Sequence, residues 1–336
     1  MLSNKKTFLI TLPEQILHFT GAYFEGFLLV GKINKAFTDM RYFYATLSQL
    51  AESGFSVEVG GIDQVCQALS KETSVYCDFS ILSVELYNQL RAIVNVKDGK
   101  LLINREIAVK SVKQLKSVKR ACEISEKSFL ATLPMIKEGV SELQIAARLE
   151  YEFKRRGANG LAFETIVAFG ENSAVPHHQT SNKKLKKNSV ILMDFGCKFN
   201  GYCSDMTRTL FYGEPDDKFL KAYEAVKNAH LIAREKIRPD MTAFEADKVA
   251  RDYLTDLKIG EYFTHSLGHG IGTLIHEFPS ISPRCDYKLK NGNVFSIEPG
   301  VYFNGEFGIR IEDSVYLKNN VVHSFMSDDL ELKILK

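Results

Sequence analysis

The chain has 336 residues, in which 43 lysines and arginines face 41 aspartates and glutamates, for a formal charge of +2. This balance excludes the strong basic excess expected of a protein whose main partner is nucleic acid or an acidic membrane surface. No apolar run approaches the ~20 residues of a membrane span, and the length is enough for two domains.

The cysteines and the N-terminus indicate a cytoplasmic protein. The six cysteines form no CxxC pair and no dense framework, which is typical of reduced thiols. The apolar stretch FLITL near the N-terminus is too short for a signal peptide and is followed by Pro13.

The first hundred residues alternate short apolar strands with helical stretches, which predicts an α/β domain. We expect strands over 27–31, 35–39 and 75–80, a helix over 41–53 and a further helix through VELYNQLRAIV. No catalytic constellation occurs in this part. A lysine-rich passage around residues 97–118 follows, so we predict two domains, 1–108 and 109–336.

The second domain shows signs of an internal duplication. Residues 113–157 predict two amphipathic helices, and the second begins with a capping box formed by Ser141 and Gln144. The segment IKEGVSELQ (136–144) is echoed by IRPDMTAFE (237–245), where Thr242 and Glu245 form the corresponding box. Two related halves, each with helices before strands, predict an active site between them.

A pair of aspartates lies in VILMDFGCKFNGYCSDMTRTL. The apolar run 190–193 predicts a buried strand, and Asn200–Gly201 is a strong signal for a two-residue hairpin turn. The resulting register places Asp194 opposite Thr207, and Asp205 becomes a diagonal neighbour of Asp194 on the same face, roughly 7 Å away. Two buried carboxylates aimed at one point require a cation between them, so this hairpin predicts a metal site. By the same alternation, Cys197 and Cys203 lie off that face and are interpreted as packing residues.

Histidines cluster in two later windows. HSLGHGIGTLIHE contains His265, His269 and His276, and its glycines allow backbone to pack closely beside His269. In VPHH, His177 follows a proline, and His178 is interpreted as a structural neighbour of His177. Three histidines within twelve residues, in a chain with a carboxylate pair, favour a functional site.

Two glutamates lie in apolar strands. Glu298 occurs in VFSIEPGVYF and Glu312 in GIRIEDSVYL. A two-residue turn at Asn304–Gly305 would place them on opposite faces, whereas a loop of odd length sets them directly across from each other, and we predict the odd loop. The structural alternative for either glutamate is an ion pair with Arg310.

Carboxylates with one imidazole suit two hard or borderline divalent ions, such as manganese, cobalt or iron. Two ions ~3.5–4 Å apart can share a hydroxide, lower its pKa and stabilise a tetrahedral intermediate. The implied chemistry is hydrolysis of an amide or ester.

The segments DFGCKFNGYCSDMTRT, HSLGHGIGTLIHE, SIEPGVY and GIRIED resemble those of the pita-bread metallopeptidases, in the branch of Xaa-Pro aminopeptidases and prolidases. FTGAYFEGFLLV and FTDMRYFYA are similar, more loosely, to the creatinase-like N-terminal domain of that branch. The resemblance covers nearly the whole chain. It implies an α+β fold, with a creatinase-like α/β domain before a pita-bread domain that has an internal pseudo-two-fold repeat.

The resemblance also implies roles for individual residues. Asp194 would be a terminal metal ligand, and Asp205 and Glu312 would bridge both ions. His269 and Glu298 would complete the second metal, and Glu298 would accept the proton of the attacking hydroxide. The histidines that are not metal ligands would position the substrate and stabilise the oxyanion: His177, His265 and His276. Arg310 would support the bridging glutamate. Because the chain lacks tryptophan, we expect phenylalanine and tyrosine to line the proline pocket, with Phe169, Tyr262 and Phe278 as candidates.

The expected activity is that of an Xaa-Pro aminopeptidase, which hydrolyses the bond between an N-terminal residue and proline in peptides. The cofactor would be two divalent ions, manganese first, with cobalt, iron or zinc as alternatives, and the assembly a homodimer. Prolidase, which accepts only dipeptides, shares the same motifs and is the alternative. A non-catalytic interaction module on this fold is the alternative from another class, although intact ligand positions argue against it. Methionine aminopeptidase and the metal-free creatinase are disfavoured by the N-terminal domain and by the intact ligands, respectively.

Overall fold

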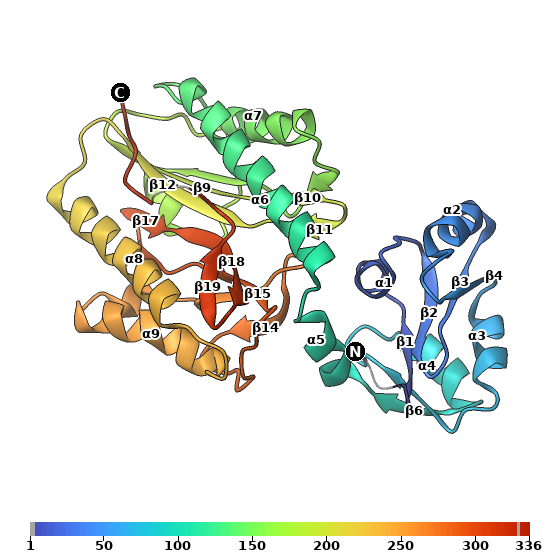
Figure 1. The fold of residues 1–336 in the computed structure, drawn as a ribbon. Coiled ribbons are helices and arrows are strands. Elements are labelled where there is room, and N and C mark those ends of the chain that lie inside the picture. The colour runs from blue at the N-terminus through green and yellow to red at the C-terminus, as the bar shows by residue number, and fades with distance from the viewer. Residues whose placement is uncertain (1–3, 328–329) are drawn as a thin grey trace. The chain divides into compact units, whose positions relative to one another are not determined.

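The computed structural model describes residues 4–327 and 330–336, and the chain divides into two compact units, 1–107 and 108–336 (Figure 1). Among the described residues, no helix combines the length and apolar character needed to cross a lipid bilayer.

The first unit is an α/β layer structure built on one mixed sheet in the order β4-β3-β2-β1-β5-β6. Its strands are β1 (Thr7–Ile10), β2 (Gly26–Gly31), β3 (Lys35–Thr38), β4 (Ser56–Val59), β5 (Ser74–Cys77) and β6 (Asn95–Asp98). Its helices are α1 (Pro13–Thr20), α2 (Met40–Leu50), α3 (Ile62–Leu69), α4 (Val84–Arg91) and α5 (Lys100–Ile107). Alternate residues of β1 serve different cores: Phe8 and Ile10 pack with α1, α2 and α5, whereas Leu9 packs with α3 and α4. Helices therefore cover both faces of the sheet, as this alternation requires.

Two element ends in this unit differ from the sequence expectation. The helix predicted to run to residue 53 ends at Leu50, where the chain turns towards Gly54 with a positive φ of 78°. The strand predicted over 75–80 ends at Cys77, because the Asp78 carboxylate accepts hydrogen bonds from the backbone N (2.8 Å) and Oγ (2.6 Å) of Ser80 and forms a turn.

The second unit is built on a long curved sheet in the order β14-β13-β15-β18-β12-β9-β8. These strands are β8 (Ile166–Phe169), β9 (Ser189–Phe195), β12 (Met206–Tyr212), β13 (Gly268–Gly270), β14 (Glu277–Ile281), β15 (Val294–Ile297) and β18 (Glu312–Lys318). Smaller pieces complete the unit: β7 (Gly160–Leu161), β10 (Cys197–Phe199), β11 (Tyr202–Cys203), β16 (Gly300–Phe303), β17 (Phe307–Arg310), β19 (Val321–Ser324), β20 (Ile334–Leu335), η1 (Leu133–Met135), η2 (Gly170–Ala174) and η3 (Gly260–Tyr262).

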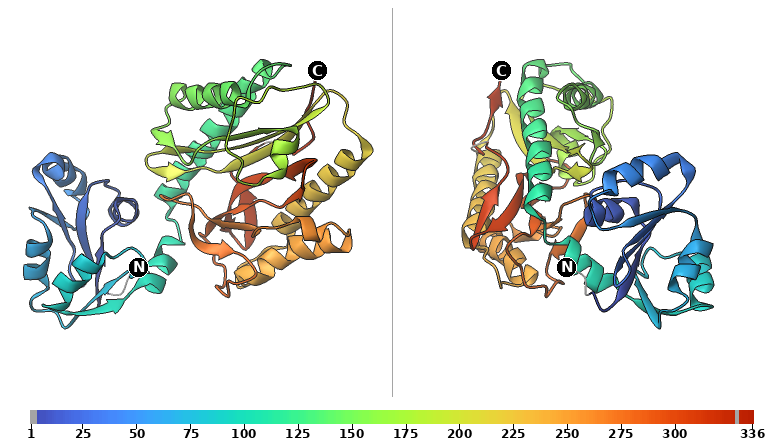
Figure 2. Two further views of the ribbon diagram at one scale, coloured as in Figure 1. Left: turned by 180° about the vertical axis from the view of Figure 1, so that it is seen from behind. Right: turned by 45° about the vertical axis from the view of Figure 1, so that its right-hand side comes forward.

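Helices accompany each half of this sheet. Helices α6 (Val112–Thr132) and α7 (Glu142–Arg155) contact β7, β8, β10 and β11, whereas α8 (Asp217–Lys236) and α9 (Ala243–Asp256) contact β14, β15, β16, β17 and β19. Figure 2 shows this division from two further directions, with the green helices beside the green and yellow strands and the orange helices beside the red strands. The halves join where β12 pairs with β18, through Met206–Asp313 and Thr207–Glu312.

The two halves repeat each other in detail. Both predicted capping boxes form, at the start of α7 and of α9. The segment before each box exchanges backbone hydrogen bonds with a buried leucine, Leu185 in the first half and Leu289 in the second. Leu185 lies in the KKLKK run, whose other members are exposed or half-buried lysines. Asp194 follows Leu185, and Glu298 follows Leu289, by the same nine residues. The duplication therefore places one acid of each half at the same distance along the chain from its leucine, Asp194 inside β9 and Glu298 directly after β15.

Candidate dinuclear metal centre

The aspartate hairpin has the predicted register. Phe199 pairs with Tyr202 and Asp194 pairs with Thr207, and the turn residues Asn200 and Gly201 have φ values of 49° and 76°. A side chain at Gly196 would lie 2.0 Å from the carbonyl oxygen of Ser204, so a glycine lets the two strands cross closely beside Asp205.

The glutamate hairpin has the predicted odd loop. Ile297 pairs with Asp313 and Gly300 pairs with Arg310, around a three-residue loop (304–306) in which Gly305 has a φ of 77°. This register sets Glu298 across from Glu312. The strand is interrupted between β15 and β16, because Pro299 has no N–H and the backbone N of Glu298 donates instead to Leu267 O (2.8 Å).

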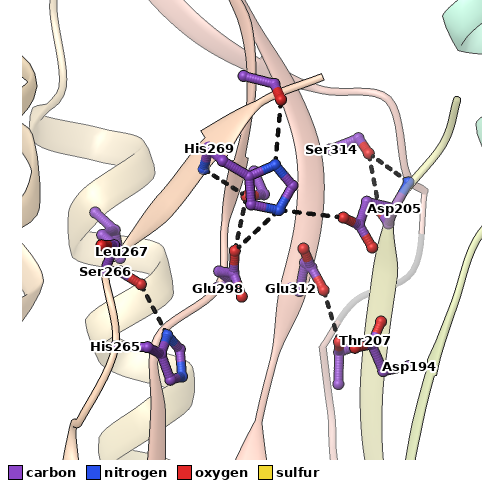
Figure 3. Close-up of polar contacts among 12 residues, drawn as sticks. Asp194, Asp205, Thr207, His265, Ser266, Leu267, His269, Glu298, Glu312 and Ser314 are labelled. Carbon is purple, nitrogen blue, oxygen red and sulfur yellow. Dashed lines mark hydrogen bonds and ion pairs between the residues drawn. The ribbon is translucent and has the colours of Figure 1, made fainter. Parts of the chain in front are cut away.

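Side chains from both hairpins and from β13 meet at one cavity of about 410 Å³ (Figure 3). Ligand atoms of Asp205, His269 and Glu312 all lie within 4.8 Å of one another. Nε2 of His269 is 3.4 Å from Oδ2 of Asp205 and 3.4 Å from Oε1 of Glu298. Asp194 lines the same cavity, so the structure brings the five predicted ligand positions together.

The acids of this cavity repel one another. Burial, and after it the negative charge of Glu312, raises the pKa of Asp205 well above its ordinary value. Burial, and after it the negative charge of Glu298, likewise raises the pKa of Glu312. Burial and the charge of Asp194 raise the pKa of Glu298 to about 7, against the opposing effect of Arg310. Oδ1 of Asp194 is buried without a hydrogen-bond partner among the described residues. Crowded carboxylates and a bare buried oxygen are what a set of metal ligands shows without its ion.

His269 has the orientation of a ligand. Its backbone N donates to Oγ of Ser296 (3.0 Å), and that hydroxyl donates to Oε1 of Glu298 (3.0 Å). Nδ1 lies 3.1 Å from Gly270 O, an acceptor, so Nδ1 holds the proton and Nε2 presents its lone pair to the acids. The oxygen-rich donor set with one imidazole fits divalent manganese, iron, cobalt or zinc.

Arg310 does not pair with either glutamate. Its Nη2 donates to Oδ2 of Asp194 (2.7 Å) and its Nε to Oγ1 of Thr207 (3.1 Å). Thr207 in turn donates to Oε2 of Glu312 (2.6 Å). The ion-pair alternative for the glutamates is therefore wrong, and Arg310 contacts the acid cluster through Asp194 and through Thr207.

The non-ligand histidines differ in their surroundings. Nδ1 of His265 lies 2.8 Å from Ser266 O and its Nε2 lies 2.8 Å from the hydroxyl of Tyr302, which accepts from Nη1 of Arg310 (2.7 Å). Burial lowers the pKa of His265 to about 3, and it is neutral with both nitrogens engaged. Burial lowers the pKa of His276 to about 4, and its ring packs edge-on to that of His269 at 4.3 Å. His276 and His177 both line the cavity, and no hydrogen bond joins the ring nitrogens of either to the described residues.

The apolar wall of the cavity is not the one expected. Phe169 is buried in the core behind the sheet, and Tyr262 and Phe278 pack against the core of the second half. The expectation is therefore wrong for these three residues, because their rings pack in or against the hydrophobic cores. The apolar lining consists instead of Phe163, Ile166, Pro176 and Ile275, so a phenylalanine is present there but at another position than expected.

Some residues of the site carry no signal in the sequence. Tyr302 links Arg310 to His265 by hydrogen bonds, but in the sequence it looks like any aromatic residue of a buried strand.

Lys110 belongs to the lysine-rich passage, yet its Nζ lies 2.8 Å from Oε2 of Glu277, and both side chains are almost wholly buried. Glu277 directly follows His276, and its Oε1 accepts from the backbone N of Leu274 (2.9 Å). A lysine that follows the domain boundary thus fixes the loop that bears a cavity histidine.

Comparison with known proteins agrees with this geometry. The profile of metallopeptidase family M24 matches residues 116–319. The Xaa-Pro dipeptidase of Pyrococcus furiosus is 37% identical to this chain, over 80% of this chain and 78% of that protein. Among solved structures, the Xaa-Pro dipeptidase from Bacillus anthracis superposes with a TM-score of 0.91 at 32% identity, covering 98% of this chain and 95% of that one. The X-Pro aminopeptidase from Thermotoga maritima superposes with a TM-score of 0.90 at 32% identity, covering 98% and 97%.

The fold and site thus define a metal-dependent peptidase of the α+β, pita-bread type with an N-terminal creatinase-like domain. The chain belongs to metallopeptidase family M24.

Proposed function

We propose that this protein hydrolyses the peptide bond before proline, with dipeptides as the favoured substrates. The observation that supports the chemistry is the convergence of acids and one imidazole from both halves on a single cavity, with a bare oxygen on Asp194. The relatives named as Xaa-Pro dipeptidases support the substrate class. They favour a dipeptidase over the aminopeptidase expected from sequence, while the likeness to an X-Pro aminopeptidase keeps that activity as the second candidate.

In this proposal Asp194, Asp205, His269, Glu298 and Glu312 hold two divalent ions, with manganese as the first choice. Bound ions would supply Lewis acidity and an activated water. Glu298 would accept the proton of the attacking water, because its carboxylate lies in the cavity beside the other proposed ligands.

The remaining cavity residues would orient the substrate. His177 and His276 would offer ring nitrogens to the reacting amide. His265 is neutral and both of its ring nitrogens are engaged, so it would line the cavity without donating to the substrate. Phe163 and Ile275 provide apolar surface for the proline ring. An X-Pro bond is a tertiary amide without an N–H, so apolar contact replaces the backbone hydrogen bond that other peptides offer.

The test is hydrolysis of Ala-Pro and of Ala-Pro-Ala by the full chain, with manganese and after chelation, with Ala-Ala as the matched control peptide. We expect manganese-dependent release of proline from Ala-Pro and little cleavage of Ala-Ala. Cleavage of Ala-Pro-Ala at a comparable rate would select the aminopeptidase. No cleavage of either proline peptide by protein with confirmed bound metal would refute both, and would leave the interaction module.

A further inference from the structure

A buried carboxylate outside the metal centre bonds to the chain segment that bears His177. Glu142, the first residue of α7, is fully buried. Its Oε1 accepts from the backbone N of Phe169 (2.8 Å) and from Nδ2 of Asn172 (2.8 Å). Its Oε2 accepts from the backbone N (2.9 Å) and Oγ (2.6 Å) of Ser181 and from Nε2 of His178 (2.9 Å).

Glu142 is held ionised by these contacts. Burial alone would raise its pKa, but the hydrogen bonds, that of Ser181 foremost, lower the pKa below its ordinary value. Because a carboxylate only accepts, Nε2 of His178 must carry the proton of that hydrogen bond. A buried charge so fully bonded fixes the positions of its donors, since the loss of any donor leaves part of a charge unsatisfied.

The donors lie on both sides of His177 in the chain. Phe169 and Asn172 precede it, and His178 and Ser181 follow it. The same segment is tied to the opposite half, because the backbone N of Gly308 donates to Oγ of Ser173 (2.9 Å). A side chain at Gly308 would lie 2.1 Å from the carbonyl oxygen of Ser173, so this approach is close.

His177 and His178 point different ways from adjacent positions. His177 is exposed and lines the cavity, whereas the His178 side chain is 13% exposed and turns to Glu142. We propose that Glu142 and His178 are positioning residues that hold His177 in the cavity, so that its ring reaches the substrate. This proposal rests on the proposed function, and it replaces the interpretation of His178 as a mere neighbour.

The alternative is that Glu142 and His178 only stabilise the fold. A structural role would lower activity equally whether His177 is present or absent. A positioning role acts through His177, so its effect should vanish when His177 is removed. A double-mutant cycle separates the two.

The experiment compares wild type, H178M, H178Q, H177A and H177A/H178M, loaded with manganese, on Ala-Pro. Methionine removes the donor at similar size, and glutamine keeps an N–H for Glu142. We expect H178M to lower kcat/KM about tenfold with unchanged metal content, and H178Q to recover most of this loss. In the H177A background the same change should alter kcat/KM by less than about twofold. H323M, at a histidine of β19 outside the cavity lining, is the control.

Equal losses in both backgrounds, or no loss in H178M, would overturn the positioning role. Crystal structures of wild type and H178M give a readout independent of turnover. We expect the His177 side chain to leave its position in the cavity in H178M, and an unchanged position would also overturn the role. Failure of the proposed function is a separate result, namely no cleavage of either proline peptide by the metal-loaded wild type.

Discussion

Nη2 of Arg310 lies 2.7 Å from Oδ2 of Asp194, and the same guanidinium donates to the hydroxyl of Tyr302 at 2.7 Å. One buried cation therefore orients a metal-ligand candidate and, through Tyr302, the neutral His265. This arrangement leaves Oδ1 of Asp194 free for an ion, while Oδ2 stays fixed by the protein.

Replacing Arg310 by methionine should lower kcat about a hundredfold, because Asp194 and His265 both lose the partner that orients them. Arg310→Lys keeps a charge but loses the planar fork, so its kcat should lie between methionine and wild type. Steady-state kinetics on Ala-Pro at saturating manganese measures both. A wild-type kcat in the methionine variant would remove the orienting role.

Asp205→Asn should abolish turnover and reduce the metal content. The change removes a charged oxygen from the group in which Asp205, His269 and Glu312 lie within 4.8 Å. Metal analysis after gel filtration and the Ala-Pro assay together check this. Asp217→Asn, at an exposed site in the first turn of α8, is the matched control and should behave as wild type. Full activity with two ions in the Asp205 variant would contradict the ligand assignment.

Manganese affinity should fall as the pH is lowered from about 8 to 6. Carboxylates must be ionised to bind metal, and in the metal-free protein burial raises the pKa of Glu298 to about 7, with Asp205 and Glu312 also raised. Binding should therefore release protons. Isothermal titration in buffers of different ionisation enthalpy measures the number released, and Glu298→Gln should reduce it. An affinity independent of pH in this window would show that the acids are already ionised.

The raised pKa of Glu298 also predicts how the stability of the metal-free protein depends on pH. A folded-state pKa above the ordinary value means that the folded protein binds more protons than the unfolded chain. The contribution of Glu298 to stability is therefore present below its ordinary pKa of 4.5 and is lost as the pH rises through about 7. Urea unfolding of chelated protein at pH 5 and pH 8, against Glu298→Gln, isolates this contribution.

Lys110→Met should destabilise the protein by about 3–5 kcal/mol, because the buried Glu277 carboxylate loses the ammonium group that lies 2.8 Å from it. The double replacement Lys110→Met with Glu277→Met should recover much of this loss, since both members of the buried ion pair are then removed. Equilibrium unfolding in urea measures both variants. A double variant less stable than the single one would show that Glu277 is held mainly by its other hydrogen bonds.

The sequence predicted those parts of the site that depend on short-range chemistry. The Asn200–Gly201 turn determines the register of one hairpin, and the odd loop before Phe307 determines that of the other, so the faces of Asp205 and Glu312 follow from turn geometry. Residue type then indicates metal. Family resemblance supplied the rest of the ligand set and the fold.

What the sequence could not provide depends on contacts between distant positions. Lys110 meets Glu277 from 167 residues away, and nothing in a lysine-rich passage marks one lysine as buried. His178 meets Glu142 from 36 residues away, so its role is invisible beside His177. Phe169 failed as a pocket residue because the direction of a strand side chain depends on which face the core occupies.

Between the halves of the second unit, β12 and β18 pair at Met206–Asp313 and Thr207–Glu312, and side chains such as Arg310 and Asp194 also bond across this seam. The candidate ligands lie on both sides of this seam, two from the aspartate hairpin and three from the later half. Ions bound there would act as a crosslink between halves, and ligand at 100 times its Kd adds about 2.7 kcal/mol to the folded state. Removal of the ions by chelation should then weaken the association of the two halves. The metal ions needed for catalysis would thus also stabilise the second unit.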